Sequence, residues 1–186
     1  MLLIVILLVG FVYGNNIEIF KAKPNAIIEN STDNNLGVCY GEDTTWNEYP
    51  YLVALRNSGG GACCTGSILS LNPGRILTAA HCLPGCIGDA YVGCNNPANC
   101  DGDAYPVTSY ILHPQWNGNV GAGYDVAVIF LSSPITTPGA MEIQIPATQF
   151  SPTTVRFSGY GRANGGVIPT SVQTALGQSL TLQQCQ

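Results

Sequence analysis

Leu77-Thr-Ala-Ala-His81-Cys82 is the stretch of this sequence that says most about the fold. It ends a longer segment, starting at Ser67, in which a strand, a turn and a second strand lead to a histidine and then a cysteine. The small residues before His81 let the backbone pack closely beside it, and a disulfide from Cys82 to an earlier strand would pin the loop. A catalytic base must be held rigidly within reach of its proton. The pattern therefore predicts that His81 is such a base.

Two adjacent cysteines lie ahead of this stretch. Neighbouring side chains on a strand point to opposite faces of the sheet. We therefore expect only one of Cys63 and Cys64 to meet Cys82. The alternative interpretation of His81 is a lone histidine that caps a strand.

The surrounding sequence is typical of an all-β protein. From Val38 onward, short apolar runs alternate with clusters of Gly, Pro, Asn and Ser, and no long stretch has helical periodicity. The predicted strands are 51–56, 64–70, 75–79, 89–92, 105–112, 125–131 and 154–158, with a further strand or strand pair in 171–182.

The histidine segment resembles the histidine motif of the trypsin/chymotrypsin-like serine protease family. The earlier stretch Cys64-Thr-Gly-Ser-Ile-Leu-Ser70 is similar to the cysteine-containing strand of that family. The resemblance implies that Cys64 forms a disulfide with Cys82. It leaves Cys63 as an additional cysteine without an assigned partner. No partner is assigned either for Cys39, Cys86, Cys94, Cys100 and Cys185.

A second segment, Asp125-Val-Ala-Val-Ile-Phe-Leu131, places a carboxylate at the start of an apolar strand. Such a carboxylate is costly to bury unless it is paired. An imidazole N–H is a suitable partner, and the carboxylate would then fix the tautomer and stabilise the imidazolium. The segment looks like the aspartate motif of the family, so we predict that Asp125 hydrogen-bonds His81. His113, in a His-Pro pair, is predicted to be a surface or structural histidine.

A third segment, Val155-Arg-Phe-Ser-Gly-Tyr-Gly161, looks like the Ser-Gly-Trp-Gly turn of the family, with Tyr160 in place of tryptophan. The resemblance covers about residues 38–186. It implies a trypsin-like double β-barrel. We predict a complete first barrel in residues 38–146, which carries His81 and Asp125, and an incomplete second barrel in residues 147–186.

The nucleophile of the family lies in a Gly-Asp-Ser-Gly-Gly-Pro segment that follows the histidine and the aspartate. Residues 1–186 contain no such segment. The chain as given is therefore expected to have no peptidase activity. Ser58, followed by three glycines, lies before His81 and fits a hairpin turn, so we reject it as the nucleophile.

Three hypotheses follow for the function. The first is a secreted serine-type endopeptidase whose nucleophile segment lies outside this chain. The second is a non-catalytic secreted homologue that acts as a protein-binding module. The third, a disulfide-stabilised module without protease ancestry, is made improbable by the three matched segments. The first two imply protein or peptide substrates or inhibitors as partners, and we expect a monomer.

Export is predicted from both the start of the chain and its cysteines. Residues 1–14 are an apolar run that fits a signal peptide and is too short to span a bilayer. Residues 15–37 are predicted to be a propeptide or N-terminal arm, with Asn30-Ser31-Thr32 as a glycosylation acceptor. The eight cysteines indicate disulfides in an oxidising compartment. Zymogens of the resembled family are cut before an Ile-Val-Gly-Gly sequence. The aligned residues here are Val38-Cys39-Tyr40-Gly41, and Gly37 precedes them in place of Lys or Arg, so a trypsin-type activation cut there is unsupported.

The composition excludes several classes of function. Hydrophobic residues make up 46% of the chain, charged residues 9%, and the formal net charge is -5. Because no basic cluster or basic amphipathic helix occurs, neither a nucleic acid nor a membrane surface is an expected partner. The cysteine spacings around His81 match no common zinc pattern, so we expect no metal and no cofactor.

Overall fold

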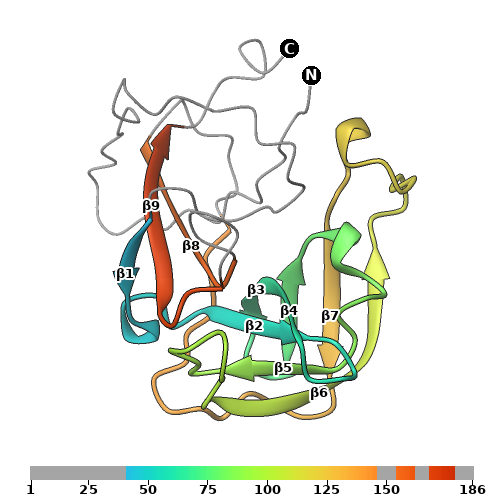
Figure 1. Ribbon diagram of the computed structural model, residues 1–186. Helices are drawn as coiled ribbons and strands as arrows, with labels where there is room; N and C mark the ends of the chain where they lie inside the picture. The colour runs from blue at the N-terminus through green and yellow to red at the C-terminus, as the bar shows by residue number, and fades with distance from the viewer. Residues whose placement is uncertain (1–40, 146–153, 162–167, 179–186) are drawn as a thin grey trace.

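The computed structural model describes residues 41–145, 154–161 and 168–178 (Figure 1). The predicted signal peptide, the residue 15–37 arm, the glycosylation acceptor, Cys39 and Cys185 lie outside the described residues. The strands are β1 (Glu42–Thr44), β2 (Leu52–Arg56), β3 (Ala62–Ser70), β4 (Arg75–Thr78), β5 (Asp89–Val92), β6 (Asp103–Leu112), β7 (Ala127–Leu131), β8 (Thr154–Gly159) and β9 (Val172–Gln178). The short 3-10 helices are η1 (Trp46–Glu48), η2 (Ala80–Cys82) and η3 (Val120–Ala122).

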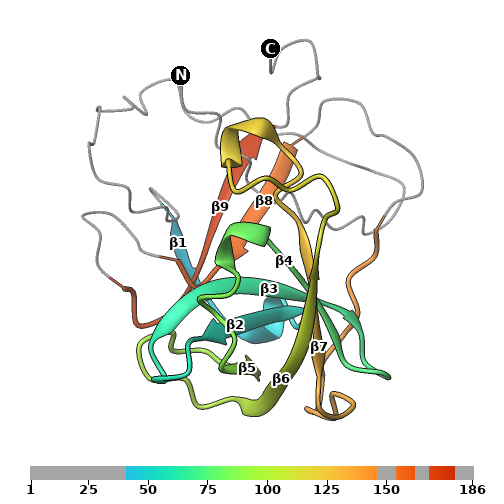
Figure 2. The ribbon, with the colours of Figure 1, turned by 90° about the vertical axis from the view of Figure 1, so that its right-hand side faces the viewer.

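Six antiparallel strands close into a barrel in the order β2-β3-β4-β7-β6-β5 (Figures 1 and 2). Burial alternates along β4 and β5, as in β4, where Ile76 and Thr78 are buried, whereas Leu52–Leu55 of β2 are all buried. Alternation of this kind sends every second side chain into the barrel. The side chains that are fully buried in this way include Val53, Leu55, Ile68, Ile76, Val92 and Ile129.

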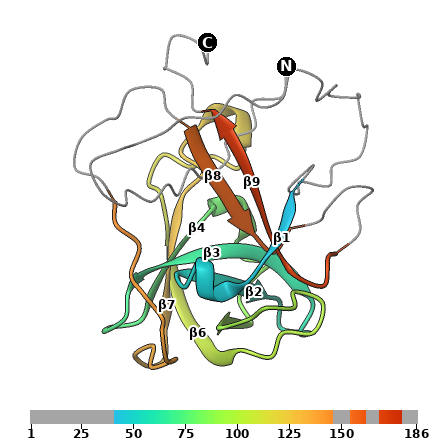
Figure 3. The ribbon, with the colours of Figure 1, turned by 90° about the vertical axis from the view of Figure 1, so that its left-hand side faces the viewer.

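The remaining strands form a separate sheet in the order β1-β9-β8, which faces the viewer in Figure 3. The sheet joins distant parts of the chain, because Thr44 of β1 pairs with Val172 of β9. The sequence analysis did not predict β1. Only Thr44 of its residues is buried, so the strand carries no periodic signal of its own.

Tyr160, directly after β8, connects this sheet to the barrel. Its side chain is only 6% exposed, and its hydroxyl donates a hydrogen bond to the carbonyl oxygen of Cys94 at 2.8 Å. Its backbone N–H donates to Oγ1 of Thr65 in β3 at 2.9 Å. Burial, with a smaller contribution from the negative charge of Asp101, raises the pKa of the Tyr160 phenol. Tyr160 thus packs as a neutral hydrogen-bond donor between the two sheets.

The predicted fold class is confirmed: the described residues form one closed barrel and a second, partial sheet. The predicted strand 125–131 starts two residues later, at Ala127. Asp125 therefore lies in the loop before β7, after Tyr124, whose φ is 63°. In the part of the chain that the structure describes, no helix has the length and apolar character needed to cross a membrane.

Candidate active site

His81 and Asp125 are brought together by the pairing of two antiparallel strands. Thr78, the last residue of β4, pairs with Ala127, the first residue of β7. The chain leaves β4 toward His81 at the same end of the strand pair at which it enters β7 from Asp125. Two segments that are distant in sequence therefore end side by side, and each carries one polar side chain to that place.

The contact between the two residues is made at two points. Nδ1 of the His81 ring lies 2.7 Å from Oδ2 of Asp125. The backbone N–H of His81 donates to Oδ1 of the same carboxylate at 2.8 Å. An ionised carboxylate only accepts hydrogen bonds, so Nδ1 must carry a proton. The aspartate therefore fixes the position of the histidine backbone and also the tautomer of the ring.

The two side chains differ in accessibility, and the difference suits a proton-transfer pair. The Asp125 side chain is fully buried, whereas the His81 side chain is 36% exposed. Both carboxylate oxygens are engaged by His81, which offsets the cost of burying the charge. Nε2 of the ring lies 3.8 Å from the sulfur of Cys82. Because Nδ1 is protonated, Nε2 carries the lone pair of the neutral ring.

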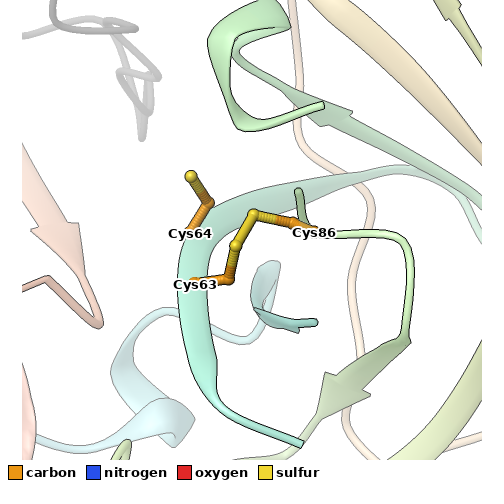
Figure 4. A group of neighbouring side chains, drawn as sticks. All are labelled: Cys63, Cys64 and Cys86. Atoms are coloured by element: carbon orange, nitrogen blue, oxygen red, sulfur yellow. A yellow bond between two sulfur atoms is a disulfide. The ribbon is translucent and has the colours of Figure 1, made fainter. Parts of the chain in front are cut away.

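Three disulfides are present among the described residues, and two of them surround the histidine. Cys64 of β3 pairs with Cys82, the last residue of η2. Cys63 pairs with Cys86, and Figure 4 shows this bond beside the Cys64 side chain. The third disulfide, between Cys94 and Cys100, closes the loop between β5 and β6. The sulfur atoms near His81 are thus joined to one another in pairs, which leaves no thiolate there for a metal ion.

The expected alternation of Cys63 and Cys64 is broken by a β-bulge. Leu55 of β2 pairs with Cys64, but Arg56 pairs with Ala62, so Cys63 has no partner across the strands. A bulge redirects the side chain of the extra residue. Only Cys64 meets Cys82, yet Cys63 reaches the same turn four residues further along. The sequence analysis did not identify Cys86 as its partner, because strand periodicity cannot signal a bulge.

The other polar residues that the sequence analysis considered lie outside this pair. Ser58 is part of a turn between β2 and β3, where the N–H groups of Gly59 and Gly61 donate to Oδ1 of Asn57. The ring of His113 stacks on Tyr124, with 4.9 Å between the ring centroids.

Residues 38–186 match the family model for trypsin. The chain belongs to the trypsin family. Proteolysis is the activity of that family.

Similar proteins include proteases of vertebrates and insects. The chain is 29% identical over 120 residues to chymotrypsin-like elastase family member 1 of Rattus norvegicus, which covers 61% of this chain and 44% of the elastase. It is 32% identical over 151 residues to trypsin iota of Drosophila melanogaster, which covers 78% of this chain and 58% of that trypsin. The chain thus spans about half the length of these relatives.

Among solved structures, the fold is similar to that of neuropsin, a serine protease expressed in the limbic system of mouse brain. The TM-score is 0.69 and the sequence identity is 19%, with 80% of this chain and 67% of the neuropsin chain covered. This likeness bears on the fold alone.

Proposed function

We propose that this chain is the histidine- and aspartate-bearing part of a secreted serine endopeptidase. In this proposal His81 is the general base and Asp125 orients it. The observation that carries the proposal is the two-point contact between His81 and a fully buried Asp125. A purely structural histidine would not need its ring nitrogen and its backbone N–H aligned on one carboxylate.

The geometry supports the following proton transfers. Nε2 of His81 accepts the proton of a serine hydroxyl as the serine oxygen forms a bond with the carbonyl carbon of the substrate. The resulting imidazolium lies 2.7 Å from Oδ2 of Asp125, which stabilises its positive charge. Nε2 then returns the proton to the leaving amine as the peptide bond breaks. The family order places the serine after the aspartate, in a segment that residues 1–186 do not include.

The location and the domain arrangement are part of the same proposal. The apolar run of residues 1–14 supports export through a signal peptide. The disulfides around His81 support an oxidising compartment, where such bonds persist. We place the first barrel in residues 38–146 and the start of the second in residues 147–186. The partners are protein or peptide substrates or inhibitors, and the protein is a monomer.

The experiment starts from the coding sequence downstream of Gln186. If it continues with a Gly-Asp-Ser-Gly-Gly-Pro segment, the continued protein is expected to hydrolyse proteins and to be blocked by a serine-directed covalent inhibitor. Asp125→Asn should lower kcat by about 10⁴-fold, because the ring loses its correct tautomer. His81→Ala should also abolish most of the activity. His113→Ala is the matched control and should retain activity, because the His113 ring stacks on Tyr124 and accepts a hydrogen bond from the backbone N–H of Gln115.

Two outcomes decide between the enzyme and the alternative. Full activity in Asp125→Asn would refute the assigned roles. A stop codon directly after residue 186, together with binding of a protein ligand and no hydrolysis, would favour the non-catalytic homologue. The 186-residue chain itself is expected to show no hydrolysis that the serine-directed inhibitor removes.

A further inference from the structure

We propose that the Cys63–Cys86 disulfide is a positioning element for His81. It holds the turn that follows the histidine, so that His81 keeps both of its contacts with Asp125. This inference rests on the proposed role of His81 and goes beyond it, because the histidine motif implies only the bond between Cys64 and Cys82.

The segment after the histidine forms one compact unit. Within this unit the backbone N–H of Leu83 donates to the carbonyl oxygen of Ala80 at 3.0 Å. The backbone N–H of Cys86 donates to the carbonyl oxygen of Cys82 at 2.9 Å. Cys82, Leu83 and Cys86 are all buried. A force on Cys86 is therefore transmitted to η2 and so to the backbone of His81.

The bulge in β3 allows two adjacent cysteines to hold this one unit. On a regular strand Cys63 would point away from Cys64, and only one of them could reach the turn. Because Cys63 is the unpaired residue of the bulge, its sulfur lies within 4.8 Å of those of both Cys64 and Cys86 (Figure 4). The turn is therefore attached to β3 at its first cysteine, Cys82, and again at its last, Cys86.

The Cys63–Cys86 bond should restrict the local motion of the turn more than it raises the stability of the whole fold. Once Cys64 and Cys82 are joined, the bond between Cys63 and Cys86 closes only a short ring made of residues 63, 64 and 82–86. The entropy that a crosslink removes from the unfolded chain grows with loop length, so a short ring adds less. A single attachment would leave the turn free to rotate about the Cys64–Cys82 bond. The second attachment removes that rotation.

Rotation of the turn would affect the site directly. His81 immediately precedes Cys82, and its N–H and Nδ1 both contact one carboxylate. The Asp125 side chain is fully buried, so the surrounding packing restricts how far the carboxylate can follow a displaced histidine. A tilt of η2 would therefore lengthen both hydrogen bonds together.

The test compares the loss of this disulfide with the loss of a distant one. The variant Cys63→Ser/Cys86→Ala replaces an exposed and a buried half-cystine. The control Cys94→Ala/Cys100→Ser replaces a buried and a half-buried one in the β5–β6 loop. Two NMR signals of the 186-residue chain are measured: hydrogen exchange of the His81 backbone amide, and the low-field resonance of the ring Nδ1–H. Each protein is measured at a temperature the same number of degrees below its own Tm, so that differences in global stability do not enter the comparison.

We expect the His81 amide to exchange about tenfold faster in Cys63→Ser/Cys86→Ala, as local opening becomes easier, and the Nδ1–H resonance to broaden or disappear. The control should leave both signals unchanged. Unchanged signals in the first variant, or equal changes in both variants, would overturn the proposal. If the first variant does not fold, Cys63→Ser/Cys86→Val, which refills the buried volume, replaces it.

The outcome is separable from that of the proposed function, because neither NMR signal requires catalysis. An inactive continued protein whose His81 amide still depends on Cys63 and Cys86 would refute the enzyme and retain the positioning role. In an active continued protein, loss of this disulfide should lower kcat more than it changes KM.

Discussion

The closed barrel and the three-stranded sheet of this protein bury apolar side chains of the same kind in different surroundings. In the barrel every strand has a neighbour on both sides, because the sheet closes on itself. In the sheet only β9 is flanked on both sides, by β1 and β8, among the strands that the structure describes. His81 follows β4 and Asp125 precedes β7, so the candidate site lies beside barrel strands whose positions are fixed by closure.

The largest effect on the free energy of unfolding should come from truncating one buried valine to alanine in the barrel, compared with the same truncation in the sheet. Val92 of the barrel and Val172 of the sheet are both 0% exposed. Because a closed barrel cannot collapse around a cavity, Val92→Ala should lower the free energy of unfolding by about 2–3 kcal/mol. Val172→Ala should cost about half as much, since the sheet can relax. Denaturant unfolding followed by tryptophan fluorescence measures both.

The matched control for this comparison is Ile111→Ala. Ile111 is 60% exposed, so its truncation should change the free energy of unfolding by less than about 0.5 kcal/mol. Equal costs for the two valine variants would mean that the sheet is held as rigidly as the barrel.

A smaller effect is expected at the junction between the two regions. Tyr160→Phe removes the hydroxyl that donates to the carbonyl oxygen of Cys94 and leaves that oxygen without its partner. The expected loss is the net contribution of one hydrogen bond, about 0.5–1.5 kcal/mol in the free energy of unfolding. Tyr124→Phe is the control, because the side chain of Tyr124 is 48% exposed. A loss that is no greater for Tyr160→Phe than for Tyr124→Phe would show that this hydrogen bond does not couple the regions.

The smallest effect is a pH dependence confined to the sheet. The Ser171 hydroxyl, and next the Gln173 amide, donate to Asp43 and lower the pKa of its carboxyl group below the ordinary value of 3.8. A lowered pKa in the folded state means that this contribution is present above about pH 3.8 and is lost as the pH falls through the folded pKa. The effect is small because Asp43 is exposed.

The measurement is an acid titration followed through the backbone amide resonances of β1 and β9. Below pH 3.8 these resonances should shift while those of the barrel strand β4 stay in place. Asp43→Asn should abolish the dependence. A shift of β4 in step with β1 would contradict the assignment to the sheet.

Much of the fold could be predicted because its signals are local. Short apolar runs between turn residues predict strands at 75–79 and 89–92, where the structure has β4 and β5, and the turn at Asn57–Gly61 follows from its glycines. The start of β7 was placed two residues early. Asp125 belongs to the loop, because the left-handed conformation of Tyr124 delays the strand.

The all-β class, the positions of most strands along the chain and the two residues of the candidate site could be predicted from the sequence alone. These depend on side-chain periodicity and on short motifs that stay together along the chain. Three features became visible only in the folded chain: β1 pairs with β9, the Tyr160 hydroxyl donates to the carbonyl oxygen of Cys94, and Cys63 forms a disulfide with Cys86. Each of these contacts joins two segments that are distant along the chain, and the sequence of one segment contains no signal that identifies the other. The bulge that redirects Cys63 lies in the pairing of β2 with β3, and that pairing is one part of a closed barrel whose geometry depends on all its strands together.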